Sequence, residues 1–241
     1  MAEDRAIRVA NLAHAVGPRA ILHDIDLDLD APRIGIIGRN GSGKSTLARL
    51  LAGLVRPTRG QVTIGGCDVA ADRRGALAQV GILFQNPEHQ IIFPTVLDEI
   101  AFGPRQSGLS RPRAEAEAEA ILARFGKAHW RDAATATLSQ GQKHLLCLMA
   151  VMAVGPRWLI LDEPLAGLDI PTRMQLGRHL DACGARLVHI SHEPRDLAGY
   201  DRILWLDEGR IRAQGGAELL ARFERCMIRE GMGDDLADLA G

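Results

Sequence analysis

The run of residues 38–46 constrains the fold of this chain more than any other feature. It matches the phosphate-loop pattern G-x-x-x-x-G-K-[ST], and an apolar run of β-formers, residues 34–37, stands directly before it. Glycines let the backbone curl and turn its N–H groups toward phosphate oxygens, and a helix beginning at Ser45 would point the positive end of its dipole at the anion. Lys44 adds a fixed positive charge, and the Ser45 hydroxyl is a ligand for Mg²⁺. The pattern predicts a binding site for the phosphates of a nucleoside triphosphate. Its residues are Gly38, Arg39, Asn40, Gly41, Ser42, Gly43, Lys44, Ser45 and Thr46.

Composition limits the partners of this site. The chain has 241 residues, of which 46% are hydrophobic, and its 29 basic and 30 acidic residues leave a net charge of -1. With no net basic field to hold a phosphate backbone, we predict no nucleic-acid partner. The four cysteines lie far apart without a CxxC pair, which is typical of reduced, buried cysteines. We expect no signal peptide, and the longest apolar run, residues 145–154, is too short to cross a bilayer.

The hydrophobic pattern alternates between the periods of strands and helices along most of the chain. Residues 7–29 have the alternation of an antiparallel hairpin around Gly17 and Pro18. The later pattern predicts strands at 61–64, 80–84, 158–161, 186–190 and 203–207, and helices at 45–54, 95–102, 110–125 (capped by Ser110), 140–154 and 172–183. Such alternation predicts an α/β fold with a mostly parallel sheet.

A second set of phosphate-site residues follows the apolar strand 158–161. This strand ends in Asp162 and Glu163, and buried carboxylates must face a cation or water. We expect Asp162 to hold Mg²⁺, as the corresponding acid of phosphate-loop enzymes does. Because neighbouring residues of a strand point to opposite faces, we expect Glu163 to be offset toward the attacking water as a polarising base.

The sequence Leu138-Ser139-Gln140-Gly141-Gln142, directly before a predicted helix, resembles the LSGGQ signature of ATP-binding cassette (ABC) ATPases. The resemblance covers essentially the whole chain and implies a P-loop NTPase fold of the ABC type, with a parallel core, an antiparallel β subdomain and an α-helical subdomain. It also implies that Ser139 and the helix-start amides contact the γ-phosphate of ATP bound to a second copy. A helix N-terminus beside a hydroxyl is an anion site on physical grounds too.

Three further residues occur in the order of that family. Gln85 resembles the Q-loop glutamine that contacts Mg²⁺ and water, and His192 resembles the switch histidine that contacts the γ-phosphate. Residues 166–169 resemble the D-loop, in which Asp169 reaches across a dimer. The resemblance thus implies a homodimer, or a dimer with a related ABC ATPase, with ATP and Mg²⁺ as cofactors.

Two positions depart from the family pattern. Gln140 replaces the usual glycine, so this position need not use a positive φ, and the contact in the closed dimer is expected to differ. Val16 stands where the hairpin usually carries an aromatic residue for adenine stacking, and His14 lies two residues before it. Both residues remain candidates for the nucleotide-binding site.

Residues 80–104 are similar to the ATPases of energy-coupling-factor (ECF) transporters. The resemblance rests on an NPxxQ run at 86–90 and on the Asp98-Glu-Ile-Ala-Phe-Gly-Pro104 run. It implies transmembrane T and substrate-binding S components as partners, and a peripheral location on the cytoplasmic face of the inner membrane. Residues 86–93 are the expected docking surface, because their apolar side chains lie beside Gln85.

Two regions, residues 138–148 and 165–173, look most like the ATPases of biotin transporters. Cobalt or nickel importers remain an alternative, because ECF transporters choose their substrate through another subunit. A soluble ABC ATPase of DNA repair or the ribosome is a third possibility. It is disfavoured because residues 86–137 leave no room for a long coiled-coil insertion.

We predict a single ABC ATPase domain over residues 1–241. Within it, residues 1–85 form an N-terminal β and phosphate-loop core, about 86–155 a helical subdomain, 156–212 the second half of the core, and 213–241 a helical tail. Residues 217–239 are amphipathic and carry Asp234, Asp235 and Asp238 near their end. A helix packed on the domain edge and a dimer contact are both compatible with this pattern.

Overall fold

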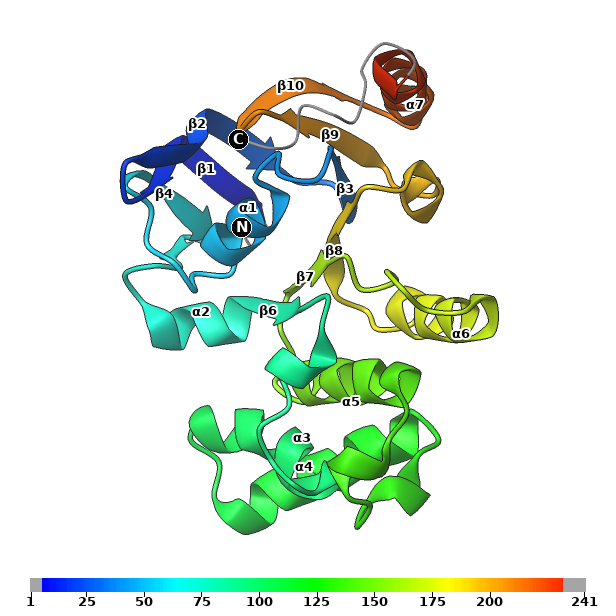
Figure 1. Cartoon of the computed structure of the whole chain (residues 1–241). Coiled ribbons are helices and arrows are strands. Elements are labelled where there is room, and N and C mark those ends of the chain that lie inside the picture. Colours follow the sequence, from blue (N-terminus) through cyan, green and yellow to red (C-terminus); the bar gives the residue numbers. More distant parts are fainter. Residues whose placement is uncertain (1–5, 232–241) are drawn as a thin grey trace.

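A computed structural model describes residues 6–231 of the chain. Figure 1 shows two sheets in the upper half of the molecule and a group of helices below them. Along the chain, the antiparallel sheet and the phosphate loop come first, then the helical subdomain, and the chain then returns to the upper half to form the remaining core strands.

The larger sheet has six strands in the order β10-β9-β3-β8-β7-β6. All neighbouring strands are parallel except β9 and β10. β7 is buried along its whole length, because helices cover both faces of the sheet. The strands are β3 (Arg33–Ile37), β6 (Val80–Leu83), β7 (Trp158–Asp162), β8 (Arg186–Ser191), β9 (Arg202–Asp207) and β10 (Arg210–Gly215).

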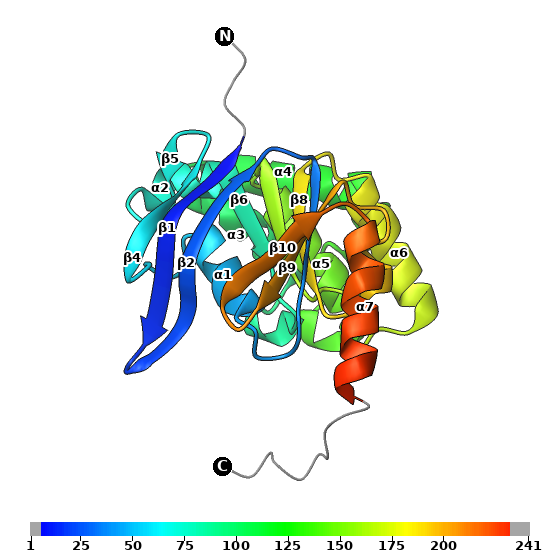
Figure 2. The same cartoon turned by 90° about the horizontal axis from the view of Figure 1, so that it is seen from above.

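The smaller sheet is antiparallel, in the order β2-β1-β4-β5. Its long hairpin runs through the predicted turn, and its tip projects from the body of the molecule (Figure 2). Irregular register along β1 marks β-bulges, which bend the hairpin. The strands are β1 (Ile7–Val16), β2 (Arg19–Leu29), β4 (Arg59–Ile64) and β5 (Cys67–Asp68).

The helix after the phosphate loop, α1 (Lys44–Leu51), lies between the two sheets and contacts β2, β7 and β8. Its apolar side shares one core with both sheets, including Leu47, Ile160 and Val188. The other helices of the core are α2 (Arg73–Gln79), α6 (Ile170–Asp181), the 3₁₀ turn η4 (Pro194–Leu197) and the C-terminal α7 (Glu218–Gly231).

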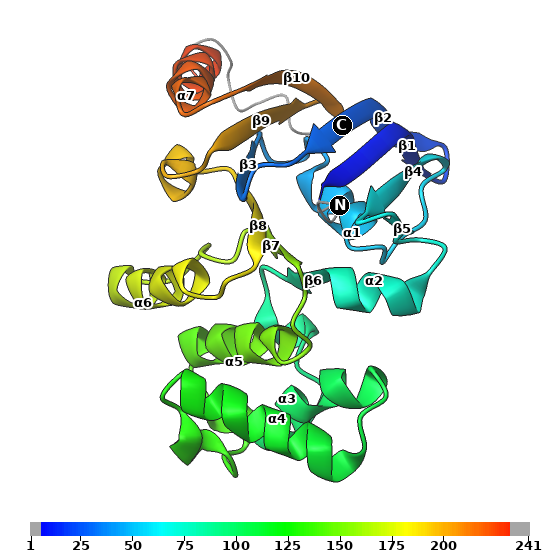
Figure 3. The same ribbon diagram turned by 180° about the vertical axis from the view of Figure 1, so that it is seen from behind.

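The helical subdomain has its own apolar core, which continues onto the lower face of the parallel sheet. Figure 3 shows α5 between α3 and α4 on one side and the sheet on the other. The elements are η1 (Pro87–His89), α3 (Val96–Gln106), α4 (Arg111–Arg124), η2 (Ala128–Trp130), η3 (Thr135–Thr137) and α5 (Gln140–Met152).

Several predicted elements differ from the structure. α3 continues four residues beyond the predicted end and contains Pro104, because burial of its apolar side outweighs the lost hydrogen bond. Ser110 occupies the N-cap of α4, but its side chain makes no capping hydrogen bond. Three short or exposed elements, β5, α2 and β10, were not predicted. The tail forms α7 up to Gly231, and the predicted acidic end lies outside the described residues.

Candidate nucleotide site

The phosphate loop joins the carboxyl end of β3 to α1. Gly41 and Gly43 have φ of 81° and 99°, in the left-handed region that glycine adopts without strain. A Cβ on Gly38 would lie 2.3 Å from the Leu206 carbonyl oxygen, so a larger residue cannot occupy that position without a shift of the backbone. The loop therefore has the curled backbone that the glycine pattern predicted.

The Lys44 side chain folds back over this loop. Its ammonium donates hydrogen bonds to the carbonyl oxygens of Gly38 and Arg39, both at 2.9 Å, and lies 3.6 Å from Glu163 Oε1. Burial lowers the pKa of Lys44, while the Glu163 and Asp162 carboxylates act in the opposite direction. The ammonium thus stands between the loop and Glu163, so a triphosphate bound to the loop would lie next to that carboxylate.

Asp162 reaches α1 because of its position in the strand. It shares the face of Trp158 and Ile160, whose side chains belong to the core around α1. Ser45 Oγ donates a hydrogen bond to Asp162 Oδ1 at 2.9 Å. Burial raises the pKa of Asp162, and the Ser45 hydrogen bond partly offsets that effect.

The Ser45 and Asp162 oxygens fit the ligand chemistry of Mg²⁺, which is usually held by one or two protein oxygens together with substrate phosphates. Among residues 6–231 no group of three or more His, Cys, Asp or Glu side chains has metal-binding geometry. Ser45 and Asp162 are the predicted metal ligands that the structure brings into contact.

The strand alternation used to predict the direction of Glu163 does not apply to it. It lies beyond the end of β7 with φ of 52°, so the alternation of strand residues does not determine its direction. Its backbone N–H donates to the Ile190 carbonyl oxygen at 3.0 Å. Its Oε2 lies 2.9 Å from His192 Nδ1, while Oε1 faces Lys44. The structure therefore brings Lys44, Glu163 and His192 together at adjacent strand ends.

The loop that carries His192 is held by an ion-pair network that the sequence did not predict. Arg173, in the first turns of α6, lies 2.8 Å from Asp196 Oδ1. Asp196 also accepts a hydrogen bond from Ser191 Oγ, which itself accepts from the Glu193 N–H. This network connects the helix after the D-loop to the loop of His192.

The predicted signature begins α5. Ser139 is its N-cap and forms a capping box with Gln142: the Gln142 side chain accepts from the Ser139 N–H at 2.8 Å, and Ser139 Oγ accepts from the Gln142 N–H at 3.4 Å. Gln140 is exposed and, as expected, does not have a positive φ. Leu138 is buried in the helical subdomain.

The signature helix packs closely on the helix that follows the D-loop. A Cβ on Gly141 would lie 2.3 Å from Thr172 Cγ2. Asp169 caps α6 by accepting a hydrogen bond from the Thr172 N–H at 2.9 Å. Hydrogen bonding by the Thr172 side chain, and then by this N–H, lowers the pKa of the exposed Asp169 carboxyl. In the described part of the chain, no hydrogen bond or ion pair joins the signature to the phosphate loop of the same chain.

The remaining predicted residues lie at separate places around the site. Gln85 lies two residues after the end of β6 and is exposed. Val16 is 64% exposed at the tip of the β1–β2 hairpin. His14 lies further down β1, and its Nδ1 is buried without a hydrogen-bond partner. The described contacts bring neither hairpin residue to the phosphate loop.

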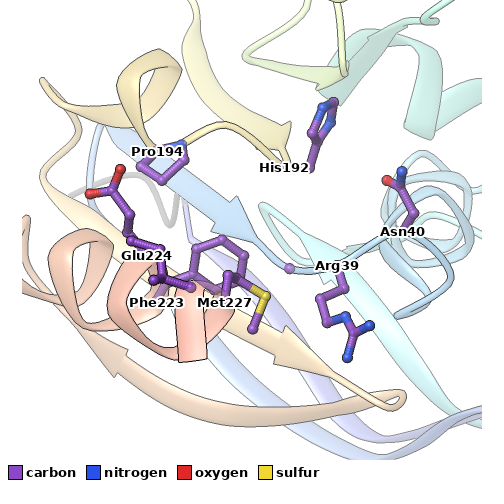
Figure 4. Close-up of a pocket in the computed structure, with 9 residues that line it drawn as sticks. Arg39, Asn40, His192, Pro194, Phe223, Glu224 and Met227 are labelled. Atoms are coloured by element: carbon purple, nitrogen blue, oxygen red, sulfur yellow. The ribbon is translucent and has the colours of Figure 1, made fainter. Parts of the chain in front are cut away.

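A cleft of about 590 Å³ borders the phosphate loop (Figure 4). Arg39 and Asn40 line one side of it, and Phe223 and Met227 of α7 line the other. Arg39 also forms an ion pair with Glu230 of α7 at 2.9 Å, although both side chains are exposed enough for water to weaken the pair. The C-terminal helix is thus a neighbour of the phosphate loop, which the sequence pattern did not reveal.

A second cavity, a mainly apolar groove of about 460 Å³, lies between the parallel sheet and the helical subdomain. At its rim Ile92 is 63% exposed. Glu99 accepts hydrogen bonds from the N–H groups of Ile92 and Phe93, at 2.9 and 2.8 Å. Burial raises the pKa of Glu99, and these two bonds oppose that effect. The groove also contains Leu54, Leu77, Ile82, Phe102, Val151 and Val154.

The sequence profile of the family described as ABC transporter matches residues 22–166, more than half of the chain. The chain is an ABC transporter ATPase. It is 50% identical over 224 residues to the biotin transport ATP-binding protein BioM of Rhodobacter capsulatus, covering 92% of this chain and 96% of that protein. It is 40% identical over 214 residues to the energy-coupling factor transporter ATP-binding protein EcfA2 of Symbiobacterium thermophilum, covering 83% of this chain and 73% of that protein.

Comparison with solved structures agrees with this assignment. The structure of cbiO1 from Clostridium perfringens, part of the ABC transporter complex cbiONQ, superimposes with a TM-score of 0.77 at 26% identity. The superposition covers 96% of each chain. No helix among the described residues of the ABC ATPase is long and apolar enough to cross a membrane.

Proposed function

We propose that this ABC ATPase binds Mg-ATP between two copies and hydrolyses it to energise uptake through an ECF-type importer of biotin. The observation that carries the proposal is the convergence of the Lys44 ammonium, the Glu163 carboxylate and the His192 imidazole beside the phosphate loop. Each has a role in phosphoryl transfer to water, and parallel strands that end at one edge favour such a cluster.

In the proposed reaction, Glu163 accepts a proton from the attacking water, whose oxygen bonds to the γ-phosphorus as the bond to the leaving ADP oxygen breaks. His192 is proposed to contact the γ-phosphate, and its hydrogen bond to Glu163 supports a second role in orienting that carboxylate. Lys44 supplies positive charge to the phosphates. Ser45 and Asp162 would hold Mg²⁺, which supplies charge neutralisation on the phosphate oxygens when bound. Gln85 is proposed as a further contact to the metal and the water.

The signature residues are proposed to complete the site of a second copy. A helix N-terminus with a serine hydroxyl is suited to a γ-phosphate, and Ser139 is exposed at the start of α5. Asp169 would contact the same partner. In this arrangement the signature serves the nucleotide bound to the other copy and not the one bound to its own phosphate loop. The signature residues are Leu138, Ser139, Gln140, Gly141 and Gln142.

Mixing two inactive variants tests the shared site. Lys44→Ala removes the charge at the phosphates of its own loop, and Ser139→Ala removes the hydroxyl offered to the partner. A heterodimer of the two retains one intact composite site, so mixing should restore part of the ATPase activity. If heterodimers form, as shown by differently tagged chains, and no activity returns, the two-copy site is refuted.

The apolar groove supports a transmembrane partner. An apolar groove with an exposed isoleucine at its rim is suited to an amphipathic helix of a T component. Ile92→Asp should weaken copurification of the membrane partner while ATP binding persists. The matched control is Met174→Asp, which places the same charge at a 63% exposed methionine of α6, outside both the groove and the cleft at the phosphate loop. Unchanged copurification with Ile92→Asp would refute the docking site.

Biotin as the substrate is supported by the 50% identity to BioM over nearly the full length of that protein. A cobalt or nickel importer is the alternative, and a non-transport ABC ATPase is a third. Purifying the tagged ATPase from its native membrane and measuring bound biotin and metals distinguishes them. Biotin on a copurified S component is expected, with the ATPase at the cytoplasmic face of the inner membrane. Cobalt or nickel without biotin would identify a metal importer instead. The absence of any membrane partner would favour a non-transport ABC ATPase.

A further inference from the structure

One fully buried histidine lies outside the cluster of reacting groups. His144 has no exposed surface, and it belongs to the second turn of α5, after the signature. Its Nδ1 lies 3.0 Å from the Gln140 carbonyl oxygen in the same helix. Its Nε2 lies 3.1 Å from the Gln85 carbonyl oxygen. The ring thus spans the start of the signature helix and the loop after β6.

Two neighbouring contacts also join α5 to this loop, but both are weaker. The Lys143–Glu88 ion pair has its carboxylate largely in water, where such pairs contribute little. Cys147 Sγ lies 3.8 Å from the Pro87 carbonyl oxygen, and a thiol is a weak donor. His144 is therefore the principal polar contact, because its fully buried ring offers the Gln85 carbonyl oxygen a stronger donor than the thiol of Cys147.

A neutral imidazole has one N–H, so it can donate to only one of the two carbonyls. When Nε2 carries the proton, the ring binds the loop to the helix. When Nδ1 carries it, the bond stays within α5. Only the Nε2–H form links the backbone of Gln85 to the helix that begins at Ser139.

We propose that His144 is a positioning residue for ATP hydrolysis, which holds the Gln85 loop and the signature helix together as one unit. The loop would serve the nucleotide of its own chain and the signature that of the partner, so this inference rests on the two-copy site proposed above. When the signature helix of one copy closes on the partner's nucleotide, its position then depends on the Gln85 loop, which serves the nucleotide of its own chain. The exposed Gln85 side chain stays free to reach the nucleotide, because His144 binds only its backbone.

Two conservative variants separate the two hydrogen bonds of the ring. His144→Gln places an amide N–H₂ near the position of Nε2 and can still donate to the Gln85 carbonyl. The asparagine of His144→Asn is one carbon shorter than glutamine, so its amide lies near the position of Nδ1. It can therefore donate to the Gln140 carbonyl but does not reach the Gln85 carbonyl. Met149→Ala is the matched control for a lost buried side chain, because Met149 lies in the same helix with its side chain in the hydrophobic core.

The experiment measures Mg-ATP-dependent dimerisation by sedimentation, with all variants made in the Glu163→Gln background to limit hydrolysis. Mg-ADP affinity is measured in parallel by calorimetry. We expect His144→Asn to weaken dimerisation about tenfold, the size of effect expected from one lost hydrogen bond, with Mg-ADP affinity unchanged. His144→Gln and Met149→Ala should dimerise within about threefold of the Glu163→Gln parent.

Equal dimerisation of His144→Asn and the parent would overturn the role of His144 while leaving the two-copy site intact. A loss of the same size in Met149→Ala, or in both His144 variants, would also overturn it, because the effect would then be general destabilisation. Failure of the Glu163→Gln parent itself to dimerise would instead overturn the two-copy site, and this inference with it.

Discussion

Replacing Gly141 with alanine tests how closely the signature helix packs on the D-loop helix. The added Cβ would lie 2.3 Å from Thr172 Cγ2, well inside van der Waals contact. Overpacking of this kind costs about 1–3 kcal/mol, whereas alanine gains about 0.5–1 kcal/mol over glycine in a helix. We therefore expect Gly141→Ala to lower the free energy of unfolding by about 1 kcal/mol. ATPase activity should fall more strongly, because the displaced helix carries Ser139.

The partner variant Thr172→Ser isolates the clash. It removes Cγ2 and keeps the hydroxyl, whose oxygen would lie 3.3 Å from the new Cβ. In the Thr172→Ser background, Gly141→Ala should be neutral or stabilising, which gives a coupling energy of about 1–3 kcal/mol between the two sites. Chemical denaturation and steady-state ATPase assays of the four proteins measure it. A coupling energy near zero would refute the close packing of these helices.

Three further outcomes are expected. Glu163→Gln should retain nucleotide binding and lose about 10²- to 10⁴-fold in turnover, and more than a tenth of the original rate would exclude Glu163 as the base. Val16→Tyr should tighten ATP binding about tenfold in an equilibrium titration, because stacking on a base contributes about 1–3 kcal/mol. If His14→Ala weakens binding strongly while Val16→Tyr has no effect, His14 is the base platform instead. Burial lowers the pKa of His189 to about 3, below its value of about 6.5 in an unfolded chain, so its contribution is present above pH 6.5 and lost as pH falls toward 3. Unfolding at pH 5 should show a loss of about 2 kcal/mol from this group, which His189→Leu should remove.

The parts of the site that depend on local sequence were predictable. The spacing of Gly41, Gly43 and Lys44 dictates a curled loop before a helix, and the structure has the positive φ angles that such a loop requires. The pair of carboxylates after an apolar strand predicts the role of Asp162, and the structure places it on the same face as Trp158 and Ile160, toward α1. The hydrophobic pattern therefore predicts the strands and helices that carry these residues, while the order of the strands in the sheet comes from the structure.

The placement of Glu163 could not be obtained in the same way. Strand alternation holds only while the chain remains in the sheet, and at Glu163 the backbone turns into the left-handed region. Its direction is determined by the Ile190 carbonyl, which belongs to the neighbouring strand β8. Contacts between segments far apart in the sequence have no local signal, and the Arg39–Glu230 pair is a second example.

Two loops beside the site are also held by contacts between segments that lie far apart in the sequence. Arg173 joins the helix after the D-loop to the loop of His192, and His144 joins the signature helix to the loop of Gln85. Both use side chains of the first turns of a helix to hold a loop that follows a strand of the parallel sheet. Because such a loop has few backbone partners of its own, its position depends on these contacts. The motifs are thus readable from the local sequence, whereas the contacts that hold the loops of Gln85 and His192 come from residues between the motifs.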